Sequence, residues 1–154
     1  MLALNHVLTV FHAIAGGVLT GAAIHNGVLA YRSLRGRSGV APRLRRLYPR
    51  VIGVTWILVM TLGLLIYPSF RVDVRGGFLD VGAPWAVWLF ELKEHGVGLG
   101  LMLLVYLIPV SGRMVDRGRG AVDLRFYDLA SLALGLVVCW ATVVGLLVST
   151  LRPL

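Results

Sequence analysis

The stretch "WAVWLFELKEHGVGLGLMLLVYLIPV", residues 85 to 110, combines a long apolar run with a cluster of ionisable groups. The run is longer than the roughly 20 residues that an α-helix needs to cross the hydrocarbon core of a bilayer. Glu91, Lys93, Glu94 and His95 nevertheless fall within five consecutive positions of it. Charged groups inside a membrane helix are costly and commonly mark a functional site. The stretch therefore predicts a transmembrane helix that carries chemistry.

Three further apolar runs accompany this one, at about residues 4–31, 49–67 and 126–150. The chain is 58% hydrophobic with a mean hydropathy of +0.84, which is far more apolar than a soluble domain of its size. None of the runs has the polar stripe that helices of a soluble bundle show. We expect one membrane domain over residues 1–154, an all-α four-helix bundle with up-down-up-down topology.

Arginines gather in the connections that follow the first and the third apolar runs. They are Arg32, Arg35, Arg37, Arg43, Arg45, Arg46 and Arg50 in the first connection, and Arg113, Arg117, Arg119 and Arg125 in the second. The connection after the second run carries only Arg71 and Arg75. The positive-inside rule then places both termini on the outer, periplasmic side of the inner membrane in a multi-pass protein. The net charge of +8 indicates contact with lipid headgroups, and we expect no nucleic-acid partner.

The depths of the four histidines single out one pair. With a rise of ~1.5 Å per residue, His12 on the first helix lies roughly 12 Å below the outer surface, and His95 on the third lies roughly 15 Å below it. His6 falls near the outer interface, and His25 falls near the cytoplasmic end of the first helix. We therefore expect His12 and His95 to face each other across the bundle.

Two imidazoles from different helices are the usual axial ligands of a low-spin b-type haem. The sequence thus predicts one haem b between the first and third helices, with His12 and His95 on the iron. Glu91 precedes His95 by one helical turn, so its carboxylate is expected to orient the imidazole ring. Lys93 and Glu94 are expected to point elsewhere, toward water or a partner.

Four further residues complete the predicted haem site. Gly16 and Gly98 share helix faces with the two histidines and would leave space for the porphyrin edge. Arg71 and Arg75 lie at the same end of the bundle and would pair with the propionates. Each of these residues also has a plainer interpretation: histidines often only bond neighbouring helices, and arginines often only mark the interface.

The segment "FHAIAGG" at residues 11–17, with a histidine on the third helix, resembles the four-helix b-type cytochromes. The chain is also similar to the copper-resistance D-type membrane proteins. The resemblance covers the topology and the first and third helices. The spacing of 13 residues between His12 and His25 departs from the paired histidines of familiar cytochromes b. The resemblance therefore implies at most one haem with two ligands from this chain.

These observations predict a membrane cytochrome b-type subunit that passes electrons between a redox partner and the quinone pool or another subunit. Other redox subunits, or further copies of the chain, would be its partners. No soluble catalytic domain is visible, so an electron-transfer or anchor subunit is favoured over a stand-alone enzyme. Two alternatives stay open. One is a copper- or proton-handling protein in which His6, His12, Met60, Met102 and the acidic pair of the third helix line an ion path. The other is a cofactor-free structural subunit in which the charges of the third helix pair with another chain.

Overall fold

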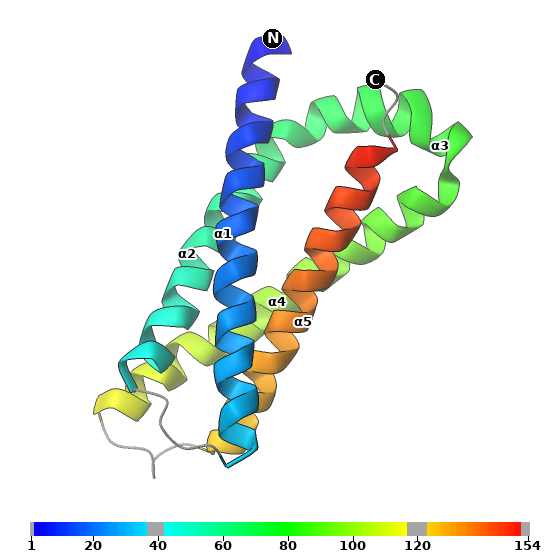
Figure 1. The fold of residues 1–154 in the computed structure, drawn as a ribbon. Helices are drawn as coiled ribbons and strands as arrows, with labels where there is room; N and C mark the ends of the chain where they lie inside the picture. Colours follow the sequence, from blue (N-terminus) through cyan, green and yellow to red (C-terminus); the bar gives the residue numbers. More distant parts are fainter. Residues whose placement is uncertain (1, 37–41, 117–122, 152–154) are drawn as a thin grey trace.

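The computed structural model describes residues 2–36, 42–116 and 123–151, and nearly all of them are helical (Figure 1). The elements in chain order are α1 (Leu2–Leu34), α2 (Pro42–Ser69), η1 (Phe70–Leu79), α3 (Asp80–Gly82), α4 (Pro84–Asp116) and α5 (Leu124–Thr150). Helices α1, α2, α4 and α5 are long and apolar enough to cross a membrane. The expectation of an all-α protein with four membrane-spanning helices is confirmed at this level.

Each of the four long helices extends beyond the apolar run that predicted it. The largest difference is in α2, which begins at Pro42, so that Pro49 lies buried inside the helix and not in its first turn. Hydropathy locates the part of a helix that meets hydrocarbon, whereas arginine-rich turns continue the helix because arginine has a high helix propensity. Proline is also well suited to the first helical position, where Pro42 stands.

The segment after α2, predicted as an outer loop, is instead helical. Element η1 is a π-helix, an uncommon conformation with a wider turn than the α-helix. Phe70, Val74 and Phe78 recur every four residues along it and pack on a small apolar core with Leu79. That core also includes Val144 of α5. The segment therefore lies across one end of the bundle as an ordered cover, as Figure 1 shows.

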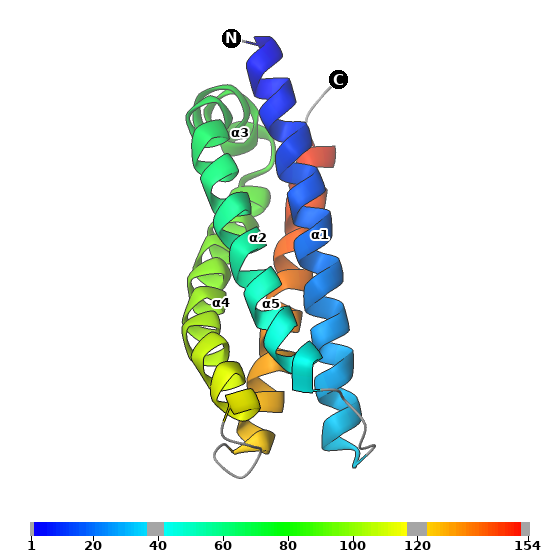
Figure 2. The ribbon, with the colours of Figure 1, turned by 90° about the vertical axis from the view of Figure 1, so that its left-hand side faces the viewer.

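The four long helices are arranged so that α1 and α4 lie diagonally opposite. Helix α1 packs along α2 and α5, and α4 packs along the same two helices, so α2 and α5 separate them (Figure 2). Asn5 donates to the Ser69 hydroxyl at 2.8 Å and joins the start of α1 to the end of α2. Thr20 and Thr142, whose hydroxyl oxygens are 2.7 Å apart, join α1 to α5.

The main core lies where the helices cross, and glycines there allow one helix to approach the next closely. A Cβ at Gly135 would meet the Ala23 carbonyl oxygen at 3.3 Å, and a Cβ at Gly100 would overlap the ring of the buried Trp56. Many large apolar side chains of all four helices remain exposed, Leu136 and Val105 among them. Such surfaces are expected for helices surrounded by lipid.

Candidate functional site

His95 lies at the centre of the exposed side of α4. Trp88 and Met102, each seven residues and so about two turns from His95 on the same face, are 77% and 73% exposed. The Nδ1 atom of His95 lies 2.8 Å from the carbonyl oxygen of Glu91. A carbonyl only accepts, so Nδ1 carries the proton in this contact, and Nε2 is left as an acceptor. His95 thus presents a basic ring nitrogen to the surroundings of the bundle.

The Glu91 carboxylate pairs with Arg75 and not with the His95 ring that it was expected to orient. Arg75 Nη2 donates to Glu91 Oε1 at 2.9 Å, and Arg75 Nε lies 3.5 Å from Asp80 Oδ1. These ion pairs join η1 and α3 to α4, and the sequence does not indicate them because the composition of residues 68–84 is typical of a loop. Arg71, the other predicted propionate partner, is exposed on η1.

His12 lies on the interior side of α1, half-buried against α2. A Cβ at Gly63 would come within 3.3 Å of the His12 ring, so glycine at that position makes room for the imidazole. A hydrogen bond with the backbone of Val59 also holds the ring. Its Nδ1 atom is buried and has no hydrogen-bond partner among the described residues. Unpaired buried polar atoms are rare in proteins, and each one calls for an explanation.

Lys93 lies two positions before His95 on α4, and its side chain is half-buried. The Lys93 ammonium lies 4.2 Å from the centre of the Phe90 ring. In the part of the chain that the structure describes, Lys93 makes no ion pair with a carboxylate. Its sequence neighbour Glu94 is exposed.

His95 lies on the exposed side of α4, whereas the sequence predicts that it faces the bundle. Residues two positions apart on an α-helix point about 200° away from each other. Lys93 is half-buried and His95 is exposed, so the two residues lie on different sides of α4. His12 packs against Gly63 of α2, and the sharing of one haem by His12 and His95 stays a prediction.

The remaining predicted site residues are dispersed. No atom lies within 4 Å of a Cβ built at Gly16 or at Gly98, so both glycines border open space, one on α1 and one on the exposed side of α4. His6 is exposed near the start of α1. His25 lies toward the other end of α1, where Nδ1 makes a hydrogen bond with the Tyr48 hydroxyl and the two rings meet edge to face.

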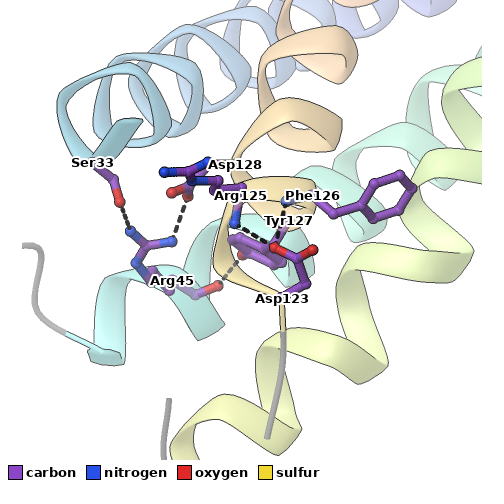
Figure 3. A network of polar contacts seen from close by, with 7 residues as sticks. All are labelled: Ser33, Arg45, Asp123, Arg125, Phe126, Tyr127 and Asp128. Carbon is purple, nitrogen blue, oxygen red and sulfur yellow. Dashed lines mark hydrogen bonds and ion pairs between the residues drawn. The ribbon is translucent and has the colours of Figure 1, made fainter. Parts of the chain in front are cut away.

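A buried ionic network lies at the end of the bundle where α1 ends and α2 begins, and the sequence did not predict it. Arg45 of α2 lies between Ser33 of α1 and Asp128 of α5, with its guanidinium nitrogens 2.6 Å and 2.5 Å from their oxygens (Figure 3). The Tyr127 hydroxyl donates to the Arg45 carbonyl at 2.9 Å. We call these four residues the Arg45 network. A carboxylate at position 128, inside the fourth apolar run, was the signal that could have revealed it.

Helix α5 begins beside this network with a regular cap. Asp123 accepts hydrogen bonds from the backbone N–H groups of Arg125 and Phe126, as Figure 3 also shows.

Across residues 2–36, 42–116 and 123–151, no three His, Cys, Asp or Glu side chains gather in a group that could hold a metal ion. Comparison of the chain with protein-family models, with curated proteins and with solved structures finds no match.

Proposed function

We propose that the chain is a haem-binding, electron-transfer subunit of the inner membrane. In this proposal the bundle is up-down-up-down with both termini on the outer side, and the Arg45 network lies at the cytoplasmic end. The concentration of arginines in two alternate connections supports that orientation. The contact of Asn5 with Ser69 at one end and of Ser33 with Arg45 at the other supports the alternating topology.

One observation supports the haem more than any other: the hydrogen bond from His95 Nδ1 to a backbone carbonyl. Histidines that bind metals usually donate their other ring N–H to a carbonyl or carboxylate, which fixes the tautomer and the direction of the ring. In His95 this leaves Nε2 free on the exposed side of α4. Gly98, one turn further along the same side, provides the open space that a flat macrocycle needs.

The residues present fit one axial ligand better than two. His95 supplies a ring nitrogen whose direction its Nδ1 hydrogen bond fixes, whereas the His12 ring packs against Gly63 of α2. The second axial position would then be filled by a neighbouring chain in the membrane, either another redox subunit or a second copy. Arg71 is the exposed cation at this end of the bundle and would meet a propionate, since Arg75 is already paired. When bound, the haem iron would carry a single electron at a time.

An absorbance spectrum of the purified protein tests the proposal. We expect a Soret band and a change in the visible region upon reduction with dithionite, in protein produced with an adequate haem supply. His95→Ala should abolish the bound haem. His6→Ala is the matched control, because His6 is also an exposed membrane-end histidine, and it should leave the spectrum unchanged. A colourless wild-type protein, or a full Soret band in His95→Ala, would overturn the proposal. Copper bound in place of haem would do the same.

The same spectrum tests whether His12 and His95 bind one haem together. His12→Ala should keep the Soret band if His95 binds haem from the outer side of α4. If both His12→Ala and His95→Ala lose it, the two rings ligate one haem as first expected from the sequence, and α4 must rotate when haem binds.

A further inference from the structure

We infer that Arg32, His25 and Tyr48 form a binding site for the phosphate group of an anionic phospholipid. His25 and Arg32 are exposed on α1, and Tyr48 of α2 is half-buried beside His25. We call these three residues the seam site, because they lie along the line where α1 and α2 pack together. The inference goes beyond the proposed haem and does not depend on it, because none of the three residues takes part in that proposal.

The first argument is the contact between His25 and Tyr48. The Nδ1 atom of His25 and the Tyr48 hydroxyl share a hydrogen bond, and the two ring centroids are 4.9 Å apart. A neutral imidazole carries one N–H and a phenol carries one O–H, so the pair has two protons to donate. Their mutual hydrogen bond uses one of these protons. Whichever residue donates it, the other proton, on His25 Nε2 or on the Tyr48 oxygen, is left for an acceptor outside the pair.

The second argument is the charge of Arg32, which is independent of the first. Arg32 follows His25 by seven residues and so about two turns on the same face of α1. Side chains of a helix lean toward its N-terminus, so we expect the guanidinium to lie toward His25. In the part of the chain that the structure describes, Arg32 makes no ion pair, hydrogen bond or ring contact. By contrast, Arg35 lies over an aromatic ring and Arg45 is paired with a carboxylate.

The anion that matches this site comes from outside the two helices that form it. Residues 1–72, which include α1 and α2, contain no aspartate and no glutamate. At the same end of the bundle, Asp123 caps α5 and Asp128 is paired with Arg45. A guanidinium beside a hydrogen-bond donor matches the oxygens of a phosphate. Basic sites between membrane helices bind the head groups of anionic lipids by this chemistry.

The surface of α1 next to the seam site favours a lipid over a soluble phosphate. Gly21 and Val18 lie about one and two turns before His25 on the same face, toward the middle of the membrane. Both are exposed, and a Cβ at Gly21 would meet no atom within 4 Å. A phosphate at Arg32 and His25 would therefore bring its acyl chains over an open apolar surface, which a free phosphate ion does not need.

Native mass spectrometry of the purified protein with added dioleoyl phosphatidylglycerol tests the inference. We expect saturable binding of this lipid that Arg32→Gln weakens about fivefold, as loss of one cation beside an anionic head group implies. His25→Phe combined with Tyr48→Phe removes both donors and keeps both rings, and it should weaken binding about threefold or more at pH 8. Arg50→Gln is the matched control and should stay within about twofold of wild type. Arg50 is also exposed, but it points about 200° away from Tyr48 on α2.

Four outcomes would overturn this inference. One is the absence of saturable binding to wild-type protein. Another is equal weakening by Arg32→Gln and Arg50→Gln, which would show a general attraction between arginines and anionic lipid. Equal affinity for dioleoyl phosphatidylcholine would show that the lipid charge is not recognised, and displacement of the lipid by inorganic phosphate would show a site for a soluble anion. Gel filtration and circular dichroism of each variant exclude misfolding as the cause.

Discussion

Arg45 near one end of the bundle and Lys93 nearer the other differ in the partners of their positive charges. In the Arg45 network, a buried guanidinium meets a carboxylate and a hydroxyl, and three helices are joined as a result. Nearer the other end, the Lys93 ammonium lies 4.2 Å from the centre of the Phe90 ring, and the Nδ1 atom of His12 is buried without a hydrogen-bond partner among the described residues. The contrast distinguishes a buried ion pair that joins two helices from a half-buried cation that lies against a ring of its own helix.

The largest effect that tests this contrast is expected at Asp128. Asp128→Ala leaves the Arg45 guanidinium buried without its carboxylate, and breaking one side of a buried ion pair typically costs about 3–5 kcal/mol. We expect a correspondingly large fall in the free energy of unfolding, measured by SDS titration of the protein in mixed micelles. An Asp128→Ala variant as stable as wild type would show that the Arg45 network does not hold the helices together.

A smaller effect is expected where α2 and α4 cross. A Cβ at Gly100 would overlap the Trp56 ring, so Gly100→Ala should cost about 1–3 kcal/mol through overpacking. Gly98→Ala is the matched control on the same helix, because a Cβ there meets no atom within 4 Å. Trp56→Phe combined with Gly100→Ala should recover part of the loss. Equal stabilities of the two alanine variants would contradict the crossing of α2 and α4.

The cap of α5 should contribute less. Asp123 accepts from two backbone N–H groups at 2.9 Å and 3.2 Å, and loss of such a cap costs about 1 kcal/mol. Asp123→Ala is therefore expected to lower the free energy of unfolding by that amount in the same SDS titration, and Asp123→Asn or Asp123→Ser should restore most of it. If the serine variant were no better than alanine, the side chain would not be capping the helix.

The smallest effect is expected at Lys93. Lys93→Met removes a half-buried cation that forms no ion pair among the described residues and keeps its apolar stem, so the free energy of unfolding should change by less than about 1 kcal/mol or rise. The comparison with Asp128→Ala is made in the same micelles. A loss at Lys93 as large as that at Asp128 would mean that Lys93 is a structural residue and would remove the basis for the contrast.

The sequence was sufficient to predict the four spanning helices, because their length and apolarity are dictated by the bilayer itself. It was not sufficient for residues 68–84, where Arg71, Arg75 and two glycines are typical of a loop. There Phe70, Val74 and Phe78 find a tertiary core against α4 and α5, which local composition does not indicate.

The facing of helix α4 illustrates the same limit at the candidate site. Helical periodicity correctly puts Lys93 and His95 on different sides, since it fixes the angles between residues of one helix. It does not fix which side meets the bundle, because that depends on packing against α2 and α5. The Arg45 network was missed for a related reason: Arg45 appeared to be one arginine among seven in a basic connection, and its partner lies 83 positions away.

The most direct test of the account is the facing of α4 in a bilayer. Spin labels placed singly at positions 95 and 102, and at 93 and 104, in a Cys139→Ser background would report the access of oxygen dissolved in the lipid. Met102 is 73% exposed and Leu104 is 2% exposed. We predict high oxygen accessibility at 95 and 102 and low accessibility at 93 and 104. High accessibility at 93 with low accessibility at 95 would contradict the structure and would restore His95 as the residue that faces His12.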